Sequence, residues 1–219
     1  MFGLGASKLD RGLDAFERRE WKRARRLLEE ALREEERASG LYHLGVMYWR
    51  GLGGPVAKQA AVDCFSRAAE LGHPGAETAY GIALRSGAGV DKDNEKARSL
   101  FRSAAGAGDR DAMIQLATMS EPDDARRWLL RASELGHAPA MTHLSDMMMQ
   151  HDPVEALSWL YASVALSGDD AARKRAASLA REMSAAEIDA AQKAAGFTLR
   201  TSSSANASGA DALSVGIGQ

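Results

Sequence analysis

The sequence has little of several residue types on which other folds depend. It contains one cysteine, which excludes an internal disulfide framework and is typical of a reducing compartment. Aromatic residues make up only 6% of the 219 residues, which favours helices packed through small side chains over a β-sandwich. No stretch approaches about 18 consecutive apolar residues, and the N-terminus lacks the apolar run of a secretory signal. We therefore expect no membrane insertion and a cytoplasmic location.

Neither sign of charge dominates. Lys and Arg number 28 and Asp and Glu number 30, so the formal net charge is -2 at pH 7. This balance gives no overall electrostatic basis for binding nucleic acid or an anionic membrane, and we expect neither as a partner. With 45% hydrophobic and 26% charged residues, the chain has the composition of a globular protein.

A repeat runs through the middle of the chain. Seven residues recur at a spacing of 36: Gly45, Gly51, Gly53, Ala61, Phe65, Gly72 and Ala76 return as Gly81, Gly87, Gly89, Ala97, Phe101, Gly108 and Ala112. Within residues 97–105 the apolar side chains fall on one helical face, as expected for the second helix of a hairpin. A third unit starts at Ala112 but has only 28 residues, because its glycine hinge is replaced by residues 120–122. A fourth unit starts at Ala140.

These residues resemble the SEL-one-like repeat (SLR) family, a relative of the tetratricopeptide repeat. The resemblance covers residues 40–195. Its matches in the first unit are Leu44, Gly45, Tyr48, Gly51, Gly53, Ala61, Phe65, Ala68, Ala69 and Gly72, and those in the second are Gly81, Gly87, Gly89, Lys96, Ala97, Phe101, Ala104, Ala105 and Gly108. It implies an all-α fold, a right-handed α-solenoid of about twelve helices stacked as antiparallel pairs.

The pattern predicts four parts along the chain. They are residues 1–39, a tetratricopeptide-like hairpin that caps the repeats; 40–168, four SLR-type helix pairs; 169–197, C-terminal capping helices; and 198–219, a flexible tail. Asp152 and the Ser184–Glu187 capping box mark helix starts, and Gly196 is expected to end the last helix.

The N-terminal hairpin is strongly charged on its outer face. Its expected inner stripe is Trp21, Ala24, Leu28, Ala31 and Leu32. On the outer face, cations come first and acids follow, which opposes the helix macrodipole. Two interpretations remain open: a surface that faces a partner, or a solvated cap face cross-linked by pairs such as Glu29–Arg33.

No residue pattern points to catalysis, a metal or a cofactor. Cys64 shares its register with Leu100, which predicts a packing role for the thiol. The histidines recur with the repeat and match no zinc-binding spacing. The glycine loops follow helices, whereas a phosphate-binding loop follows a strand. We expect a non-catalytic protein that binds no metal and no cofactor.

The predicted function is that of a scaffold or adaptor that binds a peptide or protein segment on its concave face. Mapped through the repeat register, that face consists of Tyr42, Val46, Trp49, Arg50, Thr78, Ile82, Arg85, Ile114, Thr118, Thr142, Asp146 and Met149. Tyr, Trp and Arg are enriched at binding hot spots, although Trp49 could instead pack against the N-terminal hairpin. An inhibitor or immunity-type protein that neutralises one effector is the alternative, and a hydrolase is a further one. Self-association through an open end of the solenoid also remains possible.

Overall fold

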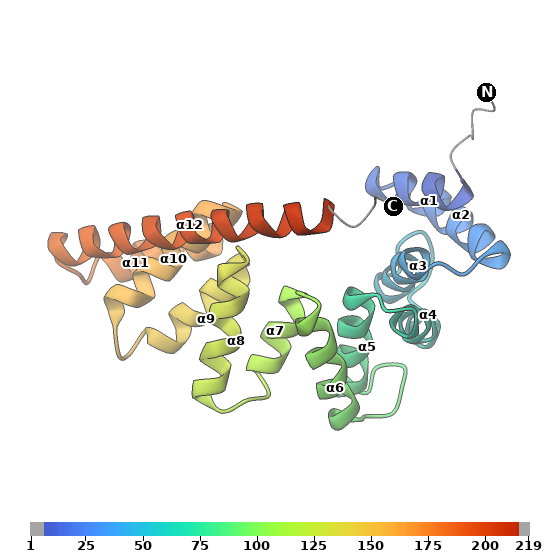
Figure 1. Cartoon of the computed structure of the whole chain (residues 1–219), viewed down its shortest axis with the longest axis horizontal. Helices are drawn as coiled ribbons and strands as arrows, with labels where there is room; N and C mark the ends of the chain where they lie inside the picture. Colours follow the sequence, from blue (N-terminus) through green and yellow to red (C-terminus); the bar gives the residue numbers. More distant parts are fainter. Residues whose placement is uncertain (1–6, 215–219) are drawn as a thin grey trace. The chain divides into compact units, whose positions relative to one another are not determined.

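The structure, a computed structural model, describes the backbone of residues 7–214 and the side chains of residues 7–202. Over this range it consists of twelve α-helices without a β-strand, which confirms the all-α prediction (Figure 1). The helices are α1 (Lys8–Glu17), α2 (Trp21–Glu34), α3 (Ala38–Arg50), α4 (Lys58–Glu70), α5 (Pro74–Ser86), α6 (Asn94–Gly106), α7 (Arg110–Ala117), α8 (Pro122–Glu134), α9 (Ala138–Met148), α10 (Pro153–Ser167), α11 (Asp170–Ala180) and α12 (Ala185–Ser214).

The chain forms two compact units, residues 1–115 and 116–219. In the first unit, α1 packs on α2, α3 on α4 and α5 on α6, as expected of helix pairs. Phe65 and Phe101, at the same repeat register, are 3% and 0% exposed. Each ring lies against a glycine of the partner helix: a Cβ built on Gly81 would be 2.6 Å from the Phe101 ring. The glycine thus lets the two helices approach where the phenylalanine fills the interface.

The glycine hinges connect the first and the second helix within a pair, α3 to α4 and α5 to α6. Gly53 and Gly89 have φ values of 75° and 80°, a left-handed conformation that suits glycine. A Cβ on Gly53 would lie 2.5 Å from the Trp21 carbonyl oxygen, and one on Gly89 would lie 2.7 Å from that of Lys58. Each hinge therefore rests on the backbone where the second helix of the preceding pair begins.

The N-terminal hairpin has the predicted inner stripe but a different charge pairing. Ala24 and Leu28 are fully buried, and Leu27, which is not part of the predicted stripe, is buried as well. Glu29 does not pair with Arg33: its carboxylate accepts from the Arg25 guanidinium at 2.9 Å and from the Tyr48 hydroxyl at 3.0 Å. The expected Glu29–Arg33 pair is wrong because Glu29 faces α3 and lies beside Tyr48.

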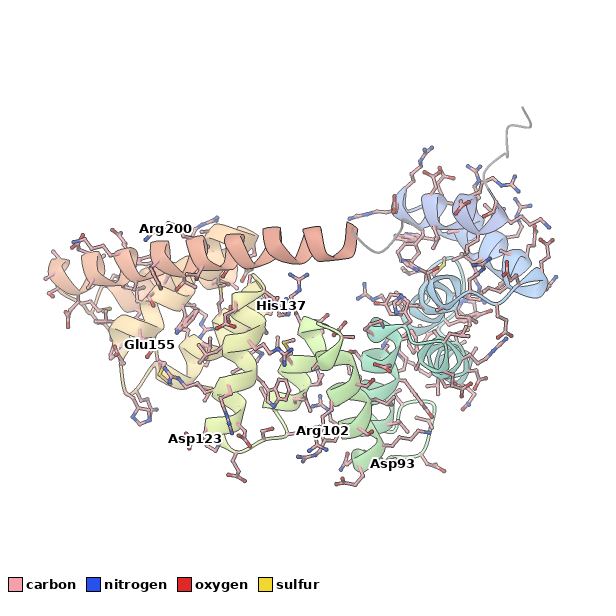
Figure 2. The ribbon with its side chains drawn as sticks, in the orientation of Figure 1. Asp93, Arg102, Asp123, His137, Glu155 and Arg200 are labelled. Carbon is pink, nitrogen blue, oxygen red and sulfur yellow. The ribbon has the colours of Figure 1, made fainter. Side chains whose placement is uncertain are left out.

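In the second unit, α10 forms the centre of the core. Leu157 and Leu160 of α10 are fully buried against alanines of α11 and α12. The two helix starts are confirmed: Asp152 accepts the backbone N–H of Glu155, and Ser184 forms a reciprocal capping pair with Glu187. Glu155, labelled in Figure 2, also accepts from the guanidinium of Arg126 and the indole of Trp159.

The flexible tail predicted for residues 198–219 is wrong over residues 198–214, where α12 continues through Gly196. Leu199 packs into a cluster with Met141 and Ala162. The Ser202 hydroxyl, 2% exposed, donates to the Ser133 carbonyl at 3.0 Å. Packing against α8, α9 and α10 outweighs the roughly 1 kcal/mol that a helical glycine costs. Residues 215–219 of the predicted tail lie outside the described residues.

No helix in the described part of the chain is long and apolar enough to cross a membrane.

Candidate partner-binding surface

Eight of the twelve residues predicted to bind a partner lie in the first unit, and four lie in the second. We name the exposed and half-buried residues of α3 and α5 in this set the α3–α5 face. The α3–α5 face consists of Tyr42, Val46, Trp49, Arg50, Ile82 and Arg85. Val46 and Ile82 occupy the same register in successive repeats, and both are half-buried.

Tyr42 joins α3 to the start of α5. Its ring stacks on that of His73, with centroids 4.5 Å apart and an angle of 20° between the rings. Nδ1 of His73 accepts the backbone N–H of Ala76 at 3.2 Å and so caps α5. Burial, and then the charge of His43, lower the pKa of His73. The neutral imidazole that this cap requires is therefore favoured in the folded chain.

Trp49 packs on α4. Its ring lies 6.1 Å from that of Phe65, and the Lys58 ammonium sits 3.6 Å from the indole centroid. The same ammonium donates to the Trp49 carbonyl at 2.9 Å, so Lys58 holds both the ring and the end of α3. Arg50, the next residue, is exposed at the C-terminal end of α3.

Two predicted contact residues of the first unit lie in its interior, which corrects their placement on a binding face. Thr78 is 4% exposed, and its hydroxyl donates to the Asp109 carboxylate at 3.0 Å. Asp109 also accepts the backbone N–H of Ala112, so Thr78 helps to secure the start of α7. Ile114 is 9% exposed and belongs to the core. Both side chains serve packing rather than contact with a partner.

The other four predicted residues lie in the second unit, and they differ in burial and in hydrogen-bond or ion-pair partners. Thr142 donates to the Ala138 carbonyl and hydrogen-bonds the Ser163 hydroxyl at 3.1 Å. Asp146 forms an ion pair with Arg175 of α11. Thr118 is exposed and Met149 is half-buried. The repeat register identified these positions, but only the packed structure shows that Thr142 and Asp146 already have partners.

The thiol of Cys64 has the packing role that its register predicted. It is 7% exposed, and burial raises its pKa to about 11. A thiol with this pKa is almost entirely protonated at neutral pH and is a poor nucleophile. Among the side chains described, no three His, Cys, Asp or Glu residues are grouped as a metal site would require.

The repeats match a known family. The model of the Sel1 repeat matches residues 38–73, 74–109 and 111–137, which correspond to the helix pairs α3–α4, α5–α6 and α7–α8. The chain contains three Sel1 repeats. Sel1 repeats generally serve as protein–protein interaction modules. The third match is short, as expected from the missing glycine hinge, and the matched residues end at 137, before the predicted fourth unit.

Solved structures of bacterial proteins have a similar fold. A Sel1 repeat protein from Oxalobacter formigenes has a TM-score of 0.68 and 20% identity over 90% of this chain and 86% of its own. A protective antigen with an SLR fold from uropathogenic Escherichia coli has a TM-score of 0.66 and 21% identity over 90% of this chain, which spans 45% of the antigen. An immunity protein from Pseudomonas aeruginosa has a TM-score of 0.57 and 19% identity over 90% of this chain and 83% of its own. No curated protein matches the sequence.

Proposed function

We propose that this protein is a non-catalytic scaffold that binds a peptide or protein segment on the α3–α5 face. The observation that carries the proposal is the recurrence of Val46 as Ile82, half-buried apolar side chains at one register of successive repeats. Trp49 and the exposed Arg50 follow Val46 by three and four residues, so they share one face of α3 with it. Apolar residues together with tryptophan and arginine have the composition of a binding hot spot.

The aromatic residues of this face are held in place before any partner binds. Tyr42 stacks on His73, and Trp49 is held between Phe65 and Lys58. A side chain that is already ordered loses less conformational entropy on binding, so the partner gains affinity from a preorganised surface. Thr118, Thr142, Asp146 and Met149 are the corresponding candidate positions of the second unit.

Affinity capture from the native host, followed by calorimetry with the purified partner, tests this proposal. The test variant is Arg50→Glu with Val46→Ala, which reverses an exposed charge and shortens one apolar side chain. We expect about tenfold weaker binding, equivalent to about 1.4 kcal/mol. The matched control is Arg102→Glu with Leu71→Ala, which makes similar changes at exposed positions of α6 and after α4. Equal affinity of the test variant and the wild type would show that the partner does not bind on the α3–α5 face.

An immunity-type protein that neutralises one effector is a second candidate. Its support is the fold similarity to the Pseudomonas immunity protein together with the charged outer face of the N-terminal hairpin. A tight one-to-one complex that survives the α3–α5 variant would favour this candidate over the scaffold.

A further inference from the structure

The turn between α1 and α2 and the first two turns of α2 carry an excess of cations. Residues 18–26 contain five arginines and one lysine but only one acid, Glu20. Arg18, Arg23 and Arg25 form ion pairs with Asp14, Glu20 and Glu29 at 3.0, 2.8 and 2.9 Å. The other three cations, Arg19, Lys22 and Arg26, are exposed and have no acidic partner within the described residues. We name Arg19, Lys22, Arg23 and Arg26 the basic end of α2.

Apart from these ion pairs, the cations do not stabilise the start of α2. The N-terminus of a helix carries a partial positive charge, so cations there repel it. Glu20, at the N-cap of α2, makes no side-chain capping bond. Arg19 has a φ of 60°, which is uncommon for a residue other than glycine. Because folding does not explain the basic end of α2, an interaction with another molecule is the better explanation.

A shallow pocket opens beside these cations. Its volume is about 560 Å³, and it is lined by Glu20, Trp21, Lys22, Arg23, Gly53 and Gly54. The Trp21 ring is half-buried and packs edge-on against Phe16, with centroids 5.4 Å apart. Gly53 and Gly54 of the hinge also line the pocket, and Gly53 lies directly against the Trp21 backbone. The pocket therefore combines Trp21 with two cations, Lys22 and Arg23, and the acid Glu20.

We propose that the basic end of α2 docks an acidic segment of a protein partner, with one apolar or aromatic side chain of that segment in the pocket beside Trp21. Carboxylates of the segment pair with Lys22, Arg23 and Arg26. Carboxylates near the start of α2 also interact favourably with the helix macrodipole, which the resident cations oppose. The acids Glu17 and Glu20 lie among the cations and disfavour a continuous polyphosphate backbone, so the charge pattern fits a protein segment better than nucleic acid. This surface differs from the α3–α5 face in position and in chemistry.

Fluorescence anisotropy with a labelled peptide tests the proposal on the full chain. The probe is an eight-residue peptide of Asp and Glu with one central Trp, measured at low salt because exposed ion pairs are screened. We expect the variant Lys22→Glu with Arg26→Glu to bind the probe at least tenfold more weakly than the wild type. Thermal unfolding of this variant should stay close to the wild-type midpoint, because both side chains are exposed and surface substitutions of this kind change stability little. Loss of binding then cannot be attributed to loss of folding.

The matched control is Arg102→Glu with Lys174→Glu, which changes the net charge equally at exposed positions of α6 and α11. This control should bind the probe as the wild type does. A peptide with Lys in place of Asp and Glu should not bind, and a peptide with Gly in place of Trp should bind more weakly.

Three results would overturn the proposal. The first is equal probe affinity of the Lys22 and Arg26 variant and the wild type. The second is binding of single-stranded RNA, but not of the acidic peptide, that the same variant abolishes. The third is a concentration-dependent dimer, detected by sedimentation and lost in that variant, without any binding of the peptide.

Discussion

Replacing Gly81 by alanine would put a methyl group where the Phe101 ring lies. Alanine in the interior of an exposed helix normally stabilises it by about 1 kcal/mol relative to glycine. At Gly81 the added Cβ would be 2.6 Å from the ring, closer than carbon atoms can approach. Phe101 is fully buried, so its ring can give way only by displacing other side chains of the core. We therefore expect Gly81→Ala to destabilise the first unit by about 1–3 kcal/mol, as overpacked cores do.

Gly106 provides the matched control. It is the last residue of α6, and a Cβ built on it would meet nothing within 4 Å. Gly106→Ala should therefore raise the free energy of unfolding by up to about 1 kcal/mol. The two substitutions are chemically identical but have opposite expected signs, so the test does not depend on an absolute stability.

A double-mutant cycle then isolates the contact. Phe101→Ala alone should cost about 3–5 kcal/mol, as for other large truncations in a core. Because the smaller side chain makes room for the methyl group, adding Gly81→Ala to it should cost nothing or should stabilise. The free energies come from urea unfolding followed by circular dichroism. If Gly81→Ala stabilised the chain as Gly106→Ala does, the packing of Phe101 on Gly81 would be wrong.

Two other predictions concern the cap of α5 and the C-terminal helix. The pKa of His73 is lower in the folded chain than its ordinary value of 6.5. Between these two pKa values the unfolded chain binds more protons than the folded chain. The free energy of unfolding should therefore fall as the pH drops below 6.5. His73→Asn keeps a capping residue and should weaken this dependence, which melting curves at neutral and acidic pH would detect; an unchanged dependence would assign it to another group. Leu199→Ala should destabilise the second unit by about 1–3 kcal/mol, because Leu199 packs on α9 and α10. A melting midpoint equal to that of the wild type would instead support the predicted flexible tail.

The repeat register predicted where each binding-face residue stands on its helix, but not whether that residue is exposed. Thr78 and Ile82 lie in the same helix, yet Thr78 is buried against Asp109 and Ile82 is half-buried. The hydrogen bond between Thr78 and Asp109 joins residues 31 positions apart, so no local sequence pattern predicts it. The pocket beside Trp21 was missed for a similar reason, because α2 and the hinge at Gly53 form it together.

The helix pairs, the glycine hinges and the shortened third repeat could all be predicted from the sequence. These features depend on helical periodicity, on capping and on the left-handed backbone of glycine, all of which are local. The continuation of α12 beyond Gly196 and the pairing of Glu29 with Arg25 and Tyr48 could not be predicted in this way. In both cases several conformations are locally acceptable, and contacts between residues distant in sequence select one of them. The fold therefore follows from short-range rules, whereas the surfaces offered to a partner follow from packing.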